Sequence, residues 1–255
     1  MLPRLHLLTH DELLADPRFP ERAGALVEIG GERLALHLRG PRTPGGRLFE
    51  LGELLLGQMV GTGACLLVND RIDVALALRP SRGEEGGRWG PGVHLGARSL
   101  PPLVARALLG PGRVGTRGEP TAWPDGGPDV LLGRSIHARG ETTGAGLDYL
   151  MVGTLYRTPS HPGREPAGPD FLERMVASTD LPLVGVGGVT PSRARALRRR
   201  GAHGVAVIRG VWDAPDPVAA LEAYLDALRI EGGPSTTADG PDAADGPSDP
   251  RPGRG

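Results

Sequence analysis

Eight short apolar runs, rich in leucine or β-branched residues, alternate along this chain with segments of helical periodicity. Such alternation is typical of parallel βα units, and eight parallel strands can close into a (β/α)8 barrel, also called a TIM barrel. The strands are expected at residues 5–9, 34–38, 65–68, 92–95, 130–135, 149–152, 183–186 and 204–208. We therefore predict an α/β fold in which one TIM barrel contains all of these strands.

The length of the chain fits one such barrel with a remainder. A chain of 255 residues is close to the usual size of this fold. Helices are expected at residues 46–61, 100–109, 170–178, 191–200 and 216–228. Residues 231–255 are mostly Gly, Pro, Ser, Asp and Ala, which is the composition of a disordered tail. We predict a barrel domain over residues 1–230 and a disordered C-terminal tail over residues 231–255.

Three connections depart from the regular alternation. Residues 81–90 and 112–128 are rich in Gly, Pro and charged side chains, and we expect loops there. Residues 138–146 leave room for little more than one helical turn, so the helix after the fifth strand is expected to be short or missing.

Composition excludes several classes of protein. The formal net charge of −1 argues against a general nucleic-acid-binding surface, and no apolar run is long enough to cross a membrane. No signal-peptide pattern opens the chain, so we expect a cytoplasmic protein. Cys65 is the only cysteine, which excludes an intrachain disulfide. We expect Cys65 to be a small buried side chain rather than a nucleophile.

The last two predicted strands end in turns that suit an anion. Thr190 stands at an expected helix N-cap and Pro191 at the first helical position, so backbone N–H groups at this turn are available to a ligand. TIM barrels commonly hold phosphate at the ends of these two strands. The predicted phosphate-binding positions are Gly187, Gly188, Val207 and Ile208. The alternative is a plain βαβ unit whose glycines only ease packing.

The other predicted strands end in polar residues. In a TIM barrel the active site lies at the carboxyl ends of the strands, so these side chains are expected to face one another. They are His37, Arg39, Asn69, Asp70, Arg71, His94, Ser135, His137 and the segment 154–161. The alternative for any one of them is a helix cap or a loop hydrogen bond.

Several of these strand ends form motifs that follow one another between about residue 3 and residue 228. They are Leu-His-Leu-Arg at 36–39, Val-Asn-Asp-Arg-Ile-Asp-Val-Ala-Leu at 68–76, Gly-Val-His-Leu-Gly at 92–96, Gly-Arg-Ser-Ile-His at 133–137, Thr-Pro-Ser at 158–160 and the two glycine-containing strand ends. In this order they resemble the thiamine phosphate synthase/TenI superfamily. The resemblance implies a TIM barrel that acts on a phosphorylated thiazole in thiamine biosynthesis.

The superfamily offers two activities. A thiamine phosphate synthase joins a pyrimidine pyrophosphate to thiazole phosphate with Mg²⁺, whereas a TenI-type thiazole tautomerase aromatises a thiazole phosphate carboxylate by moving a proton, without a metal. The synthase pattern has Gln-x-Arg-x-Lys after the second strand and a further lysine after a Thr-Pro-Thr run. This chain keeps Arg39 but has Pro41 and His161 where those lysines are expected.

The synthase pattern also has a metal-binding aspartate shortly after His-x-Gly, where this chain has Ser99, although Asp70 remains. Mg²⁺ prefers carboxylate and phosphate oxygens in a near-octahedral shell, so one carboxylate is a poor site. The missing charges are also those that a departing pyrophosphate needs. We therefore predict a tautomerase without a metal or other cofactor, and Mg²⁺ at Asp70 only if the chain is a synthase.

In the TenI-type pattern the proton-transfer residue is the histidine of Gly-x-Ser-x-His, which is His137 here. An imidazole with a pKa near 6.5 can accept and return a proton at neutral pH. His37 matches the TenI-type His-x-Arg variant and is expected to orient the substrate carboxylate with Arg39, the alternative being a satisfied barrel-mouth histidine. The substrate- and phosphate-binding candidates are Arg39, Asn69, Ser135, Thr158, Ser160, Gly187, Gly188, Val207 and Ile208.

Two alternatives to the tautomerase stay open, namely a thiamine phosphate synthase and a non-catalytic barrel that binds a phosphate ligand. In each case the expected partner is a small molecule of the thiazole phosphate type, with no nucleic acid and no membrane. The oligomeric state is open, and a homo-oligomer is one alternative. His94 is expected to be structural or a wall of the substrate site, and His161 lies in a Pro-rich loop that could cover the site.

Overall fold

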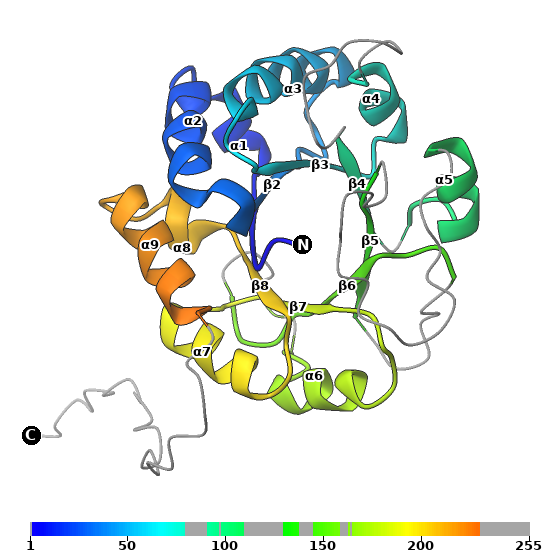
Figure 1. Ribbon diagram of the computed structural model, residues 1–255, viewed down its shortest axis with the longest axis vertical. Coiled ribbons are helices and arrows are strands. Elements are labelled where there is room, and N and C mark those ends of the chain that lie inside the picture. The colour runs from blue at the N-terminus through cyan, green and yellow to red at the C-terminus, as the bar shows by residue number, and fades with distance from the viewer. Residues whose placement is uncertain are drawn as a thin grey trace, which may run out of the picture.

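The computed structural model describes residues 2–79, 91–96, 98–109, 130–137, 145–158, 163 and 165–229. In this part of the chain, eight parallel strands close into a barrel in sequence order, with helices around it (Figure 1). The strands are β1 (Leu5–Leu8), β2 (Leu34–Leu38), β3 (Cys65–Asn69), β4 (Gly92–Leu95), β5 (Leu132–Ile136), β6 (Tyr149–Gly153), β7 (Leu183–Val186) and β8 (Gly204–Val207). The predicted TIM barrel is confirmed.

The strand ends differ slightly from those predicted. Thr9 lies outside β1, although its N–H still donates to the His37 carbonyl at 3.1 Å. Ile208 lies outside β8 because its carbonyl accepts from the N–H of Trp212 at 3.2 Å, which begins a helix. Both of these shifts occur where a strand passes into the next element. In addition, β3 and β6 end one residue later than predicted, and β5 covers Leu132–Ile136 rather than residues 130–135.

The helices lie between successive strands. They are α1 (Asp11–Ala15), α2 (Phe19–Gly30), the 3₁₀ helix η1 (Gly31–Arg33), α3 (Gly45–Met59), α4 (Ile72–Ala77), α5 (Pro102–Leu109), α6 (Pro169–Val176), α7 (Pro191–Arg199), α8 (Arg209–Trp212) and α9 (Pro217–Ala227). The five predicted helices correspond to α3, α5, α6, α7 and α9. The predicted helices do not include α1, α2, η1, α4 or α8, most of which are too short to show a helical period.

The longest unpredicted helix is α2. Residues 19, 23, 26, 27 and 30 are buried along it, which is helical spacing. Pro20 and Gly24 interrupt that pattern in the sequence. Pro20 lies in the first turn, where its missing N–H costs nothing, and a Cβ at Gly24 would lie 3.1 Å from Cδ of Gln58 on α3. Gly24 therefore allows α2 and α3 to approach closely.

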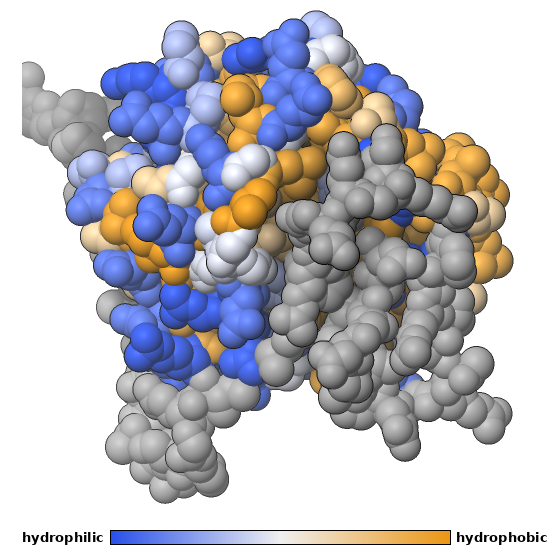
Figure 2. Space-filling view, turned by 45° about the horizontal axis from the view of Figure 1, so that its top comes forward, coloured by the Kyte–Doolittle hydropathy of each residue, from blue (hydrophilic) through white to orange (hydrophobic). Residues whose placement is uncertain are grey.

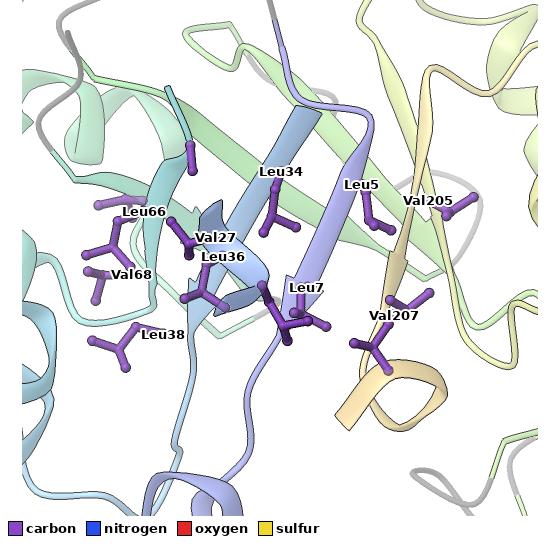
Figure 3. Close-up of a cluster of buried hydrophobic side chains, with 14 of the residues drawn as sticks. Leu5, Leu7, Val27, Leu34, Leu36, Leu38, Leu66, Val68, Val205 and Val207 are labelled. Atoms are coloured by element: carbon purple, nitrogen blue, oxygen red, sulfur yellow. The ribbon is translucent and has the colours of Figure 1, made fainter. Parts of the chain in front are cut away.

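Two apolar layers explain the nearly continuous apolar runs of the strands. The inner layer fills the barrel and includes Cys65, Leu67, Tyr149, Met151 and Ala206. The outer layer packs the opposite strand faces against the helices, as Figure 3 shows for Leu5, Leu7, Leu34, Leu36, Leu38, Leu66, Val68, Val205 and Val207 with Val27 of α2. Cys65 is buried, as expected.

One helix leaves apolar side chains on the surface. On α5, Ala105, Arg106 and Leu109 are buried, whereas Leu103 and Leu108 are 61% and 52% exposed. Figure 2 shows hydrophobic side chains gathered on the right of the molecule, the side on which Figure 1 places α5.

Several predictions concern residues outside the described part of the chain. They are the loops at 81–90 and 112–128, most of the connection 138–146, and the tail at 231–255, so these stay predictions. None of the described helices is long and apolar enough to cross a membrane. The cytoplasmic location and the oligomeric state also stay predictions.

Candidate active site

The carboxyl ends of the strands form the barrel mouth, where TIM-barrel active sites lie. Side chains alternate between the two faces of a strand. On β2, Leu36 and Leu38 pack in the outer layer, so His37 points into the barrel. Asn69 on β3 and Ser135 on β5 each contact a histidine side chain on the neighbouring strand. The structure therefore brings three of the predicted site residues together at one end of the barrel.

His37 lies behind Asn69 rather than at the surface of the mouth. Its Nδ1 is 2.9 Å from Asn69 Oδ1, and its Nε2 is 2.9 Å from His6 Nδ1. His6 Nε2 in turn lies 3.2 Å from the Pro3 carbonyl oxygen. Since both ring nitrogens of His37 face protein groups, any influence of His37 on a ligand carboxylate passes through Asn69.

Burial controls the charge of these rings. It lowers the pKa of His37 from 6.5 to about 4, with a further contribution from the Arg39 charge and against the hydrogen bond to Asn69. Burial also brings the pKa of His6 well below its usual value, and the neighbouring His37 and His94 add to the shift. Both imidazoles are therefore neutral near pH 7.

A second buried ring lies beside His37, since the ring centroids of His37 and His94 are 5.3 Å apart. His94 Nδ1 is 2.8 Å from the Tyr149 hydroxyl, and His94 Nε2 is 2.9 Å from Ser135 Oγ. Burial lowers the pKa of His94 well below its usual value, and the neighbouring His37, Arg39 and His137 add to the shift. A Cβ at Gly133 would overlap the Tyr149 ring, which explains the glycine that begins the Gly-x-Ser-x-His motif. His94 therefore orients the Ser135 hydroxyl, which agrees with the expected structural role.

His137 follows the end of β5. Its Nδ1 lies 2.7 Å from the Gly153 carbonyl oxygen. A carbonyl can only accept, so Nδ1 carries the proton and Nε2 of the neutral ring carries the lone pair. His137 is close enough to His94 for its charge to affect the pKa of that ring. This tautomer is the one that a general base acting through Nε2 requires.

Arg39 supplies positive charge at the mouth. Its backbone is fixed by Thr9, whose Oγ1 accepts from the Arg39 N–H at 2.8 Å and donates to the Arg39 carbonyl at 2.9 Å. The half-buried guanidinium contributes to the lowered pKa values of both His37 and His94. The positive charge of Arg39 therefore lowers the pKa of buried histidines on both β2 and β4.

The carboxylate that the resemblance connects with Mg²⁺ is largely engaged by the protein. Asp70, with a φ of 63°, accepts at Oδ1 from the Gly96 N–H at 2.8 Å and from the Ser99 hydroxyl. The Asp70 N–H donates to the His94 carbonyl at 2.9 Å. Among the described residues, no group of three or more His, Cys, Asp or Glu side chains could hold a metal ion. These donors do not form a metal site by themselves.

The turn after β7 is shaped by two glycines with positive φ. Gly187 has a φ of 98° and Gly188 a φ of 61°, conformations that other residues rarely adopt. A Cβ at Gly187 would overlap Thr154, and one at Gly188 would overlap the Arg157 carbonyl oxygen. The chain after β6 therefore presses against this turn, and only glycine fits at both positions.

Helix α7 begins as the sequence predicts. Thr190 is its N-cap, with Oγ1 accepting from the Arg193 N–H at 3.3 Å, and Pro191 is in its first turn. The first N–H groups of a helix have no acceptor within the helix, so this turn can offer them to an anion. The binding of phosphate here stays a prediction.

The second predicted phosphate turn follows β8, which pairs with β7. Val207 is the last residue of β8, and Ile208 immediately precedes α8. The Tyr224 hydroxyl, from α9, donates to the Val189 carbonyl at 2.8 Å, and a Cβ at Gly210 would overlap the same hydroxyl. Tyr224 therefore contacts both turns.

The predicted site residues did not include His6, Tyr149 or Tyr224. For His6 a signal was present, because it alternates with Leu5 and Leu7 within a predicted strand and so faces the interior. Thr158 lies in the segment after β6, whereas Ser160 and His161 lie outside the described residues.

Comparisons with known proteins agree with this fold and identify relatives of the chain. A family model described as thiamine monophosphate synthase matches residues 124–211. A thiamine-phosphate synthase of Roseiflexus castenholzii is 36% identical over 202 residues, covering 78% of this chain and 77% of that protein. One of Haloquadratum walsbyi is 30% identical over 237 residues, covering 89% of this chain and 92% of that protein.

Two further matches bear on length and on fold. The bifunctional thiamine biosynthesis protein ThiM/ThiE of Symbiobacterium thermophilum is 42% identical over 171 residues, which cover 66% of this chain and only 30% of that protein. A solved thiamine phosphate pyrophosphorylase from Pyrococcus furiosus superposes with a TM-score of 0.64 at 24% identity, covering 88% of this chain and 95% of that one. This likeness supports the fold. From the extent of the matches to the two thiamine-phosphate synthases, the chain belongs to the thiamine phosphate synthase/TenI superfamily, an enzyme family of thiamine biosynthesis.

Proposed function

We propose that this chain is a thiamine phosphate synthase, which joins a pyrimidine pyrophosphate to thiazole phosphate and releases pyrophosphate. The observation that carries the proposal is the match, over most of both chains, to relatives named thiamine-phosphate synthase. This proposal replaces the tautomerase as the first choice, because no comparison supports the tautomerase specifically.

The reaction involves two anionic groups, and the barrel mouth offers a separate place for each. The thiazole phosphate suits the turns after β7 and β8, where backbone N–H groups at Gly187, Gly188 and Ile208 can donate without a charged side chain. The pyrophosphate suits the ends of β2 and β3, beside Arg39. As the bond from the pyrimidine methylene carbon to the pyrophosphate oxygen breaks, negative charge builds on that oxygen, and the Arg39 guanidinium would stabilise it.

Mg²⁺ enters this proposal only through Asp70. One carboxylate, with Oδ1 already accepting from Gly96 and Ser99, does not make a metal site without ligands from elsewhere. We therefore assign no step of the reaction to a metal ion. Experiment has to decide whether activity depends on Mg²⁺ and whether activity is lost in Asp70→Ala.

A thiazole tautomerase is the second candidate, and His137 favours it. The Nδ1–H bond to the Gly153 carbonyl fixes the tautomer in which Nε2 would accept a proton from a thiazole carbon and return it elsewhere on the ring. The replacement of a second carboxylate by Ser99 has no consequence for such a reaction. It would, however, weaken metal-assisted departure of pyrophosphate.

Two assays on one protein preparation separate these candidates. The first supplies pyrimidine pyrophosphate, thiazole phosphate and a series of Mg²⁺ concentrations, and we expect thiamine phosphate. The second supplies the non-aromatic thiazole phosphate carboxylate tautomer with a chelator and follows aromatisation. Rapid aromatisation without thiamine phosphate formation would reverse our order of preference.

Variants strengthen the distinction. His137→Asn should reduce aromatisation by roughly 10²-fold or more if His137 is the acid–base group. If His137 only supports the loop after β5, the loss should be small. Should both assays be silent while thiazole phosphate still binds, the non-catalytic alternative is favoured.

A further inference from the structure

Three successive carbonyl groups in the turn after β7 each accept a hydrogen bond from a different part of the chain. The contacts are the Tyr156 N–H to the Gly187 carbonyl at 3.0 Å, Arg193 Nη1 to the Gly188 carbonyl at 2.8 Å, and the Tyr224 hydroxyl to the Val189 carbonyl at 2.8 Å. The donors come from the segment after β6, from α7 and from α9. Each of these three peptide planes is therefore fixed by a group outside the turn.

Fixing a carbonyl also fixes the N–H of the residue that follows it. The peptide bonds of this turn are trans, so each N–H points away from the carbonyl of its own peptide group. The N–H groups concerned are those of Gly188, Val189 and Thr190, and none of them donates to an acceptor among the described residues. Val189 is a buried residue, and buried N–H groups are nearly always hydrogen-bonded. An anion in this turn would supply the missing acceptor.

Arg193 contacts the turn at two points. Its backbone N–H donates to Thr190 Oγ1 at 3.3 Å, and its side chain reaches back to the Gly188 carbonyl. The side chain is exposed, yet its guanidinium carbon lies 4.4 Å from the centroid of the Tyr156 ring. This is a cation–π contact, so the guanidinium is held between the ring and the carbonyl.

The Tyr156 ring restrains the Arg193 side chain. An exposed arginine has several rotatable bonds, and ordering them for one hydrogen bond costs conformational entropy. The ring lowers this cost because it already holds the guanidinium over its face. A Cβ at Gly188 would lie 2.9 Å from Cβ of Tyr156, so the ring is attached directly beside the peptide that Arg193 orients.

We propose that Arg193 and Tyr156 are positioning residues of this turn, with Arg193 orienting the Gly188–Val189 peptide so that the Val189 N–H donates to the phosphate of a phosphomonoester ligand. The guanidinium acts through this peptide and not by direct contact with the anion. The place of the phosphate at this turn rests on the proposed function. The effect of Arg193 on the turn does not.

The effect on the turn can be measured by nuclear magnetic resonance relaxation of the full chain without a ligand. In the natural protein we expect backbone order parameters of about 0.85 for the N–H groups of Gly188 and Val189, as in rigid backbone. Arg193→Leu and Tyr156→Leu should each lower both values, toward about 0.6, whereas Tyr156→Phe keeps the ring and should not. Unchanged order parameters in Arg193→Leu would overturn the proposal.

A matched pair of ligands tests the consequence for binding independently of turnover. The probes are thiazole phosphate and the same thiazole with a hydroxyl group in place of the phosphate, both titrated by calorimetry. We expect Arg193→Leu to weaken the binding of thiazole phosphate by about 3- to 10-fold and to leave the binding of the hydroxyl compound unchanged. An equal loss for both compounds would show that Arg193 supports the barrel mouth in general and would contradict the proposal.

Arg195→Leu is the matched control for charge. Arg195 is exposed on the same helix, and its side chain is not among the described contacts of the turn. We expect this variant to bind thiazole phosphate as the natural protein does. A loss as large as that of Arg193→Leu would indicate a general effect of the charge of α7 and would contradict positioning.

Salt separates positioning from direct attraction of the anion. Attraction by an exposed guanidinium is screened by salt, so the difference between the natural protein and Arg193→Leu would then disappear between about 0.05 M and about 0.5 M NaCl. Positioning acts through a neutral backbone donor, so we expect the ratio of the two affinities to persist. A ratio that falls to one at high salt would overturn the proposal.

These measurements are distinct from the test of the proposed function. If no thiamine phosphate is formed but the order parameters and the affinity ratio behave as expected, the proposed function fails and the positioning role stands. If the natural protein does not bind thiazole phosphate, the ligand assigned to this turn is wrong, and the relaxation measurement alone decides whether Arg193 orders the turn.

Discussion

Replacing Arg106 with leucine should destabilise the barrel beneath the candidate site. Arg106 projects from α5 and is buried against the connection to β6. Its guanidinium donates to the carbonyls of Gly146 and Val130, each at 2.9 Å, and to Asp148 Oδ2 at 2.6 Å. Asp148 Oδ2 also accepts from the Leu132 N–H at 2.7 Å. Arg106 therefore connects α5 by hydrogen bonds to the segments that immediately precede β5 and β6.

The size of the effect follows from what the change leaves behind. Arg106 is 7% exposed and the Asp148 side chain is 9% exposed, so the substitution leaves a buried carboxylate without its cationic partner. Breaking a buried pair from one side costs about 3–5 kcal/mol. For a domain of this size, that corresponds to a melting temperature lower by roughly 6–20 °C.

The cost should also depend on pH. Burial already raises the pKa of Asp148 despite the Arg106 charge, and removing that charge raises it further. The folded variant then holds a proton that the unfolded chain releases near pH 4. The stability of the variant falls as pH rises from the unfolded pKa of Asp148 to its raised pKa in the folded protein. The loss in free energy of unfolding relative to the natural protein should therefore be larger at pH 8 than at pH 5.

Urea unfolding followed by circular dichroism at pH 5 and pH 8 measures both effects. Arg47→Leu on α3 is the matched control, because its ion pair with Glu50 is exposed and should be worth at most about 0.5 kcal/mol. The double variant Arg106→Leu/Asp148→Leu should regain much of the loss, since no buried charge remains. A deficit below about 1 kcal/mol for Arg106→Leu at pH 8 would refute this reasoning.

Three further predictions concern the phosphate turns and the tail. Tyr224→Phe leaves the buried Val189 carbonyl without its donor at 2.8 Å, so the free energy of unfolding should fall by about 1–3 kcal/mol. The affinity for thiazole phosphate, measured by calorimetry, should fall several-fold. An unchanged affinity would show that Tyr224 does not support the phosphate turn. Gly188→Asp should abolish that binding, because it adds a side chain and a negative charge where the backbone must meet the anion. Deleting residues 231–255 should leave melting temperature and turnover nearly unchanged, and a fall of many degrees would indicate that this segment packs on the barrel.

The strands could be predicted from the sequence because each one is buried on both faces. A run such as residues 183–186 is apolar throughout and is bounded by turn-forming residues, which leaves few alternatives. Helix α2 was not predicted because proline and glycine usually interrupt a helix, and α2 contains Pro20 and Gly24. The structure places the proline in the first turn and the glycine against α3, where neither disrupts the helix.

The candidate site was predictable only as a set of strand ends. Since all carboxyl ends of a parallel barrel meet at one mouth, His37, Asn69 and Ser135 had to be near one another once eight strands were assigned. Their partners could not be inferred in the same way. The contacts of His37 with His6 and Asn69 join residues 31 and 32 positions apart and depend on how neighbouring strands are staggered. Sequence periodicity gives the face of a strand but not this stagger.

Charge is what separates the two enzymatic candidates at this mouth. The turns after β7 and β8 would bind phosphate through backbone groups, and both candidate substrates carry that phosphate, so these turns cannot discriminate between them. On the other side of the mouth the described residues place the Arg39 guanidinium beside buried rings whose pKa values are lowered and which therefore add no positive charge near pH 7. A departing pyrophosphate needs more cationic charge than Arg39 supplies alone, and an ion bound partly by the substrate itself would be one source of it. If Asp70 and pyrophosphate oxygens together recruit that ion, the synthase reaction is complete with the residues present. If they do not, the remaining chemistry at the mouth is proton transfer at His137.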